Sequence, residues 1–203
     1  MDRAVKTIAA VQGASSAVVQ DIFRALVARW QSSARIAGVL EESHGQDDQV
    51  CGAGYLRSIA NGARYSMFQD LGPGSTACRI DPAGVLLAGE AVRRDIAAGC
   101  DLVLLNRFAK LEAERQGLMS AFVAAVEAQV PLLTSVSPAF QGAWERFAAP
   151  LFVTLPAEPE TIDGWWRAVR ASALTEDNTC DDDSASPHVN ANGIAKKSLT
   201  SGI

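Results

Sequence analysis

Hydrophobic positions along the chain form short apolar runs that alternate with longer amphipathic segments. The runs of strand length cover residues 7–12, 35–40, 102–106, 132–136 and 151–155. Nearly continuous apolar runs are typical of parallel strands, because helices cover both faces of a parallel sheet. The segments with helical spacing cover residues 17–30, 83–98, 118–128, 139–147 and 159–172. This alternation predicts an α/β fold with helices on both faces of a mostly parallel sheet.

Two stretches depart from the alternation. Between residues 50 and 79, Asn61-Gly62 separates two stretches of alternating apolar and polar residues, which predicts an inserted hairpin with a tight primed turn at a sheet edge. From about Leu174 the chain is rich in Asp, Ser, Asn and Thr, and such a segment cannot offset its ordering entropy. We therefore expect one α/β domain over residues 1–173 and a disordered polar tail over 174–203.

Composition narrows the possible functions. The 203 residues suffice for one well-buried domain, and the net charge of -5 without a basic run argues against nucleic acid and anionic membranes as partners. No run approaches the roughly 20 apolar residues of a membrane helix, and the first apolar run is too short for a signal peptide. We expect a cytoplasmic protein. The 4 cysteines and 2 histidines are widely spaced, so no metal site is predicted.

The first candidate site is the stretch TIAAVQGASSAVVQDIFRALVARW, residues 7–30, which has an apolar run, a glycine turn and a helix. A Walker-type phosphate-binding loop has this plan, with GxxxxGK followed by Ser or Thr. Counted from Gly13, the second glycine, the lysine and the hydroxyl are replaced by Val, Val and Gln at positions 18–20. Ser15 or Ser16 caps the helix, or the exposed N–H groups there hold an anion.

A second candidate site follows the strand at residues 102–106, which ends in the polar Asn106. The loop after it carries Arg107, Lys110 and Glu112, together with the apolar Phe108 and Leu111 that would pin it to the core. Ligands of open α/β sheets bind outside the carboxyl ends of the strands, where this loop must lie. The charged residues are either a ligand site or a solvated turn.

A third candidate site is the stretch QDLGPGSTACRIDP, residues 69–82, in which a glycine turn is followed by hydroxyls and an arginine suited to an oxyanion. The plain alternative is a turn that leads to a helix capped by Asp81. The residues assigned to ligand binding here are Gly72, Gly74, Ser75, Thr76, Cys78 and Arg79.

Other residues are interpreted structurally. His44 lies in a polar loop without an evident nucleophile, so no Ser-His-Asp triad is predicted. Of Trp165 and Trp166, at least one is expected in the core.

The stretches QDLGPGSTACRIDP, DLVLLNRFAKLEAERQGL and LPAEPETIDGWW resemble, in order and spacing, a family of small bacterial proteins known as a domain of unknown function. The resemblance covers about residues 5–170. The family pattern Asn-Arg-Phe-Gly-Lys, with Glu after one further residue, matches 106–112 except that Ala109 replaces the glycine. Members are often encoded beside molybdate transport genes, so the resemblance implies a molybdenum-related accessory role and a partner in molybdate transport.

A more remote resemblance is to the small P-loop nucleoside triphosphatases, whose Walker B strand ends Asp-Glu. Against that pattern, Asn106 replaces the magnesium-associated Asp and Arg107 replaces the catalytic Glu. The resemblance thus implies a P-loop-like three-layer fold with both Walker motifs degenerate. The replacements, with Lys110 and Arg79 added, predict a site that holds an anion rather than a cation.

These observations favour a non-catalytic binding or accessory protein that recognises a small anion, such as molybdate or a nucleotide. They identify no cofactor. The rival is a nucleoside triphosphatase or phosphotransferase that uses Glu112 or Glu114 as base. A partner-binding adaptor with a vestigial pocket is a third interpretation. We predict negligible ATP and GTP hydrolysis, far below the ~1 per second of slow enzymes. We also predict that the strands at 7–12 and 102–106 are parallel neighbours or near neighbours.

Overall fold

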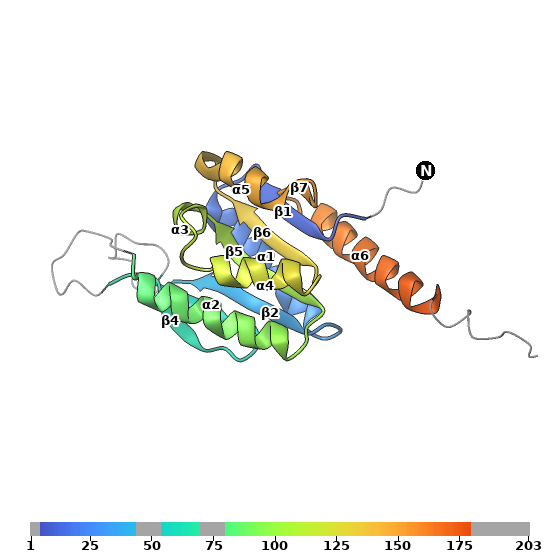
Figure 1. Ribbon diagram of the computed structural model, residues 1–203, viewed down its shortest axis with the longest axis horizontal. Coiled ribbons are helices and arrows are strands. Elements are labelled where there is room, and N and C mark those ends of the chain that lie inside the picture. Colours follow the sequence, from blue (N-terminus) through green and yellow to red (C-terminus); the bar gives the residue numbers. More distant parts are fainter. Residues whose placement is uncertain (1–4, 44–53, 70–79, 180–203) are drawn as a thin grey trace, which may run out of the picture.

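A computed structural model describes residues 5–43, 54–69 and 80–179, with the side chains of 175–179 left aside. Figure 1 shows a central sheet between helices. The strands are β1 (Ile8–Gln12), β2 (Ile36–Glu42), β3 (Tyr55–Ser58), β4 (Arg64–Ser66), β5 (Leu102–Phe108), β6 (Leu132–Val136) and β7 (Phe152–Pro156). The helices are α1 (Ser16–Trp30), α2 (Pro82–Ala97), α3 (Lys110–Ala113), α4 (Met119–Glu127), α5 (Gln141–Ala148) and α6 (Pro159–Thr179), with a 3-10 turn at Pro138–Phe140.

The described strands form one sheet in the order β4-β3-β2-β5-β6-β1-β7. Neighbouring strands in the part β2-β5-β6-β1-β7 pair in parallel. β3 pairs antiparallel with both β2 and β4. β6 lies between β1 and β5 and is parallel to both, so the prediction for these two strands is confirmed. The α/β class is also confirmed, and the strand, glycine turn and helix at β1–α1 give the sheet its P-loop-like plan.

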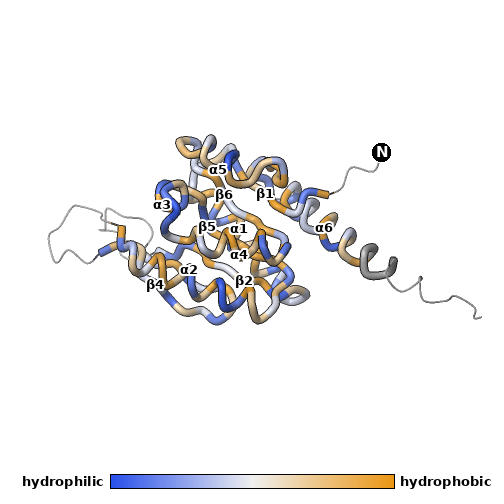
Figure 2. Tube along the Cα trace, in the orientation of Figure 1, coloured by the Kyte–Doolittle hydropathy of each residue, from blue (hydrophilic) through white to orange (hydrophobic). Residues whose placement is uncertain are grey.

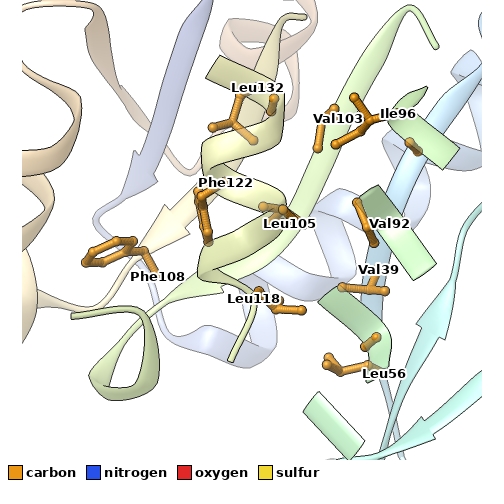
Figure 3. Packing of buried hydrophobic residues seen from close by; sticks show 14 of the residues in the cluster. Val39, Leu56, Val92, Ile96, Val103, Leu105, Phe108, Leu118, Phe122 and Leu132 are labelled. Carbon is orange, nitrogen blue, oxygen red and sulfur yellow. The ribbon is translucent and has the colours of Figure 1, made fainter. Parts of the chain in front are cut away.

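Two buried clusters hold the helices to the sheet. Phe122 of α4 lies in the cluster that joins the sheet to α2, α4 and α5 (Figure 3). Phe23 and Trp166 lie in the cluster on the other face, beneath α1 and α6. Along β5, Leu104 belongs to the second cluster and Leu105 to the first, because successive side chains of a strand point to opposite faces. Figure 2 shows the resulting apolar centre of the molecule.

The inserted hairpin lies at the sheet edge as predicted, but its turn differs from the tight two-residue form. The connection spans residues 59–63, and the Ser58 N–H donates to the Ala63 carbonyl at 2.7 Å. Asn61 Oδ1 accepts from the Ala63 N–H at 2.9 Å, so the asparagine side chain closes the turn, and Gly62 adopts a φ of 75°. The Asn-Gly pair therefore predicts the position of the turn correctly, but the turn is longer than these two residues.

The last helix extends further than its apolar spacing indicates. α6 continues to Thr179, past Ser172, where the pattern predicted its end, and so includes residues 174–179 of the expected tail. Trp165 and Trp166 are both buried, at 8% and 2% exposure, so the expectation that at least one of them lies in the core is confirmed. Within the described residues, no helix combines the length and the apolarity needed to cross a membrane.

Candidate functional site

The carboxyl ends of β1, β5 and β6 meet at one edge of the sheet, where a cavity of about 530 Å³ opens beside α1 and α5. Cavities of about 300–1,000 Å³ are the size of small-ligand sites. Of the residues predicted to bind a ligand, Gly13, Ser15, Ser16 and Arg107 line this cavity. Its other lining residues are Val11, Gln12, Ala14, Val19, Ser135, Val136, Ser137, Pro138 and Gln141.

The loop from β1 to α1 is short. Gly13 has a φ of 93°, which glycine adopts readily, and α1 begins at Ser16. Ser15 is the helix cap, because its Oγ accepts from the Val18 N–H at 3.4 Å. Positions 18–20, which a Walker loop would use for phosphate contacts, already lie inside α1, and Val19 is buried. The first turn of α1 lines the cavity directly.

A β-bulge at the end of β5 gives Asn106 and Arg107 their positions. The register between β5 and β6 shifts between Leu105 and Phe108, so two residues of β5 lie opposite Ser135 of β6. Ser135 Oγ donates to the Asn106 carbonyl at 2.8 Å and satisfies a group that the ladder leaves unpaired. Phe108 then returns to the core at 1% exposure, which confirms that it pins the loop.

Asn106 lies behind the cavity in a buried polar cluster. It is 4% exposed, and its carbonyl also accepts from Gln20 Nε2 at 3.0 Å. Its Nδ2 donates to Glu41 Oε1 at 2.9 Å, and the Glu41 N–H in turn donates to Gln20 Oε1 at 3.3 Å. Its Oδ1 is buried and has no hydrogen-bond partner in the described part of the chain. Asn106 therefore organises the strand ends of β2 and β5, and it does not line the cavity.

Arg107 joins this cluster to the first turn of α1. Its Nη1 donates to Ser16 Oγ at 3.1 Å, and its Nη2 lies 3.4 Å from Glu41 Oε1. The Glu41 side chain is only 12% exposed and that of Arg107 is 34% exposed. The predicted change from a cation-holding to an anion-holding site is thus incomplete, because the carboxylate of Glu41 in β2, which was not assigned to the site, lies beside Arg107.

Amides and hydroxyls form the opposite wall of the cavity. Gln12 Nε2 donates to Gln141 Oε1, and Gln141 Nε2 donates to Glu145 Oε1 at 3.0 Å. This chain of side chains ties the end of β1 to α5. Ser135 and Ser137 add hydroxyl groups from the end of β6. Neutral polar groups therefore surround Arg107, the one arginine among the described residues that line the cavity.

Lys110 and Glu112 were predicted to bind the ligand, but their side chains make contacts elsewhere in the loop. Lys110 Nζ lies 4.0 Å from Glu114 Oε1, and both side chains are more than half exposed, at 67% and 51%. Glu112 Oε2 accepts from the Ala109 N–H at 3.0 Å, and its Oε1 accepts from the Leu118 N–H at 3.1 Å. Neither Lys110 nor Glu112 lines the cavity beside Arg107. The exposed position of Lys110 matches the alternative of a solvated turn, whereas Glu112 is buried.

Glu112 is buried at 5% exposure. Burial raises the pKa of its carboxyl, and the backbone hydrogen bonds oppose that rise. Ala109, which stands in place of a glycine, has φ -142° and ψ -148°, a negative φ that tolerates its methyl group. Glu112 therefore holds a tight loop together from within.

Residues 70–79 of the third candidate stretch lie outside the described residues. They contain Gly72, Gly74, Ser75, Thr76, Cys78 and Arg79, and His44 is also outside the described residues. On either side of them, Phe68 and Ile80 pair as an isolated antiparallel bridge beyond β4. The predicted convergence of Arg79 with Arg107 therefore stays a prediction.

Several site residues were missed from the sequence. Glu41 was placed in the polar loop that contains His44, although it lies inside β2, one residue before the end of the strand. Gln20 was counted only as a failed Walker position. Gln12 and Ser135 are polar residues at the carboxyl ends of apolar runs, the same signal that identified Asn106, so this signal could have found them.

Comparison with known proteins places the chain in a family. The family model described as "Protein of unknown function (DUF2478)" matches residues 8–165, which include all the described strands and the beginning of α6. The chain is 34% identical over 147 residues to the Molybdenum import ATP-binding protein ModC 2 of Bradyrhizobium diazoefficiens. The matched part is 71% of this chain but only 16% of that relative, so the relative's name describes a much longer protein. No solved structure matches. The chain belongs to the DUF2478 family, which confirms the resemblance seen in its motifs.

Proposed function

We propose that this protein binds a small oxyanion or a phosphate group at the carboxyl ends of β1, β5 and β6, and does not hydrolyse it. The observation that carries the proposal is the position of Arg107. Its guanidinium lines the cavity and donates to Ser16 in the first turn of α1. A guanidinium and the N-terminal N–H groups of a helix both attract negative charge, and here they act on the same space.

The rest of the lining supports an anion of small size. The Ser137 hydroxyl and the second N–H of the Gln12 and Gln141 amides can each donate a hydrogen bond to an oxyanion, whereas the one O–H of Ser135 already donates to Asn106. Glu41 offsets part of the charge of Arg107, so affinity must come from several directed hydrogen bonds rather than from a strong positive field. Such an arrangement favours a compact polyoxygen anion.

The similarity to a protein named for molybdenum import makes molybdate the first anion to test. We propose an accessory role in molybdenum handling, in which the protein binds the anion or reports on it to a component of molybdate transport. The similar segment lies within a longer import protein, and this supports a function beside such machinery.

The rival activity, hydrolysis of nucleotides, has little support in the contacts. Both carboxylate oxygens of Glu112 accept backbone hydrogen bonds, and Glu114 lies beside Lys110 on the exposed side of the loop. A general base must reach the water it activates, and neither of these groups lines the cavity. Magnesium-dependent turnover near ~1 per second would overturn the proposal.

The test is a thermal-shift panel of molybdate, tungstate, sulfate, phosphate, ATP and GTP, each with and without magnesium. An anion present at 100 times its Kd adds about 2.7 kcal/mol to the free energy of unfolding, which raises the melting temperature measurably. We expect one or more oxyanions to stabilise the wild type and the Lys110→Ala variant, and to lose this effect in Arg107→Ala. A panel without any shift would contradict the proposal.

A further inference from the structure

The guanidinium of Arg107 contacts two oxygen atoms that belong to different elements. One is Ser16 Oγ, 3.1 Å from Nη1, and the other is Glu41 Oε1, 3.4 Å from Nη2. A hydroxyl in the first turn after a glycine loop and a carboxylate from a neighbouring strand are oxygen ligands of the kind that bind magnesium. In this protein a permanently charged side chain bridges them.

Buried contacts hold this arrangement from behind. Asn106 Nδ2 donates to Glu41 Oε1 at 2.9 Å, and the amide orientation follows because a carboxylate can only accept. The opposite atom of the amide, Oδ1, is therefore left as a buried acceptor that finds no donor within residues 5–43, 54–69 and 80–179. The Glu41 carboxylate is thus fixed by Asn106, and it fixes Arg107 in turn.

We propose that the guanidinium of Arg107 is a built-in cation that takes the place of a divalent metal in this site. The ligand is then a free oxyanion or phosphate monoester that arrives without a metal, and not a magnesium–nucleotide complex. A divalent cation at the same two oxygens would lie against the guanidinium, and the like charges would repel each other. This inference rests on the proposed function for the identity of the ligand class, but the place of the cation can be tested separately.

Glu41 is the positioning residue in this arrangement. A guanidinium has five N–H donors, and the two contacts to Ser16 and Glu41 leave others for the cavity that Arg107 lines. Without the carboxylate, the long side chain of Arg107 loses its anchor on the β2 side. The anion would then meet the same charge in a less fixed geometry.

The first experiment measures the binding of a divalent cation in the absence of any anion. Manganese is titrated into the wild type, Arg107→Gln and Lys110→Gln in the absence of any anion, and binding is followed by electron paramagnetic resonance. We expect Arg107→Gln to bind manganese at least tenfold more tightly than the other two proteins, because only this variant frees Ser16 and Glu41. Equal binding by all three folded proteins would overturn the inference, whether or not an anion ligand is found.

The second experiment measures phosphate and molybdate binding by calorimetry with magnesium and with a chelator. The wild type should bind equally in both conditions. Arg107→Gln should bind at least tenfold more weakly with the chelator and regain affinity with magnesium or with added guanidinium. Anion binding by the wild type that requires magnesium would contradict the inference that Arg107 replaces the metal, but it would agree with the proposed anion site. Absence of binding by the wild type in both conditions would instead contradict the proposed function.

The role of Glu41 is read from a double-mutant cycle. Glu41→Gln should weaken anion binding in the wild-type background but not in the Arg107→Gln background, because it acts through the arginine. A residue that served only the fold would weaken binding in both backgrounds alike. Circular dichroism of each variant confirms that folded proteins are compared, and Arg107→Lys, which retains charge without the planar fork, replaces any variant that does not fold.

Discussion

The two halves of the stretch from Asn106 to Glu112 perform different tasks although only a few residues separate them. In the first half, Arg107 lines the cavity and connects Ser16 to Glu41. The second half builds the loop, because Glu112 accepts the backbone N–H groups of Ala109 and Leu118. The comparison teaches that charged residues in one short motif need not share one ligand. Variants of each half should therefore affect different measurements.

The largest effect is expected from Glu112→Ala. The change leaves two backbone N–H donors of a buried loop without their acceptor, and each such donor costs about 1–3 kcal/mol. We expect the free energy of unfolding to fall by roughly 2–5 kcal/mol, as measured by urea denaturation. Glu114→Ala is the matched control and should change stability by less than about 0.5 kcal/mol, because its carboxylate is exposed. Similar losses in both variants would remove the distinction between the halves.

Arg107→Ala should affect binding more than folding. One charge-assisted hydrogen bond to an anion contributes about 1.5–3 kcal/mol, so the affinity for the best oxyanion should fall roughly ten- to a hundredfold. Arg107→Lys should also weaken binding because the planar fork is lost. Calorimetry measures the affinity, and denaturation should show a loss of stability below about 1 kcal/mol because the side chain is partly exposed. Unchanged affinity in Arg107→Ala would make the first half a structural turn as well.

A smaller effect should follow the pH. Burial raises the pKa of the Glu112 carboxyl above its ordinary value of 4.5, so the folded protein holds this proton more tightly than the unfolded chain. The stabilisation is full below pH 4.5 and is lost as the pH rises through the raised pKa of the folded protein. Denaturation curves of the wild type and Glu112→Gln should therefore diverge as the pH rises, with the wild type losing more stability. Parallel pH profiles would show that burial of the charge has no net cost.

The smallest effect is expected from Lys110→Ala. Its contact with Glu114, four residues further along, is exposed and 4.0 Å long, and such pairs contribute about 0.3–0.5 kcal/mol. Anion affinity should stay within twofold of the wild type in calorimetry. A tenfold loss of anion affinity would show that Lys110 contributes to the anion site. Both halves of the motif would then act in binding.

The fold could be predicted largely from local patterns. The apolar run of β5 is buried from Leu102 to Leu105, and a run that is apolar on both faces indicates a central parallel strand without any tertiary information. The hairpin was found from Asn61-Gly62 for the same local reason. Its exact turn was not, because it depends on the hydrogen bond between the Asn61 side chain and Ala63.

The site could be predicted only in part. Ser16 and Arg107 were found because a glycine turn and a polar strand end are visible in the sequence. Glu41 was missed because its role depends on β2 lying beside β5, a neighbour relation that sequence spacing does not contain. The direction of Lys110 was misjudged although the i, i+4 spacing to Glu114 was visible and favours an exposed pair.

The position of β1 in the sheet has a consequence for how the protein is made. Both neighbours of β1 come from the far end of the chain, β6 on one side and β7 on the other. During synthesis β1 therefore lacks both of its partner strands until residues up to 156 have been translated. Contacts between such distant segments slow folding, and nascent chains expose the apolar strand meanwhile. A ribosome-bound chain that stops after α4 should accordingly be more sensitive to protease around β1 than one that extends beyond β7.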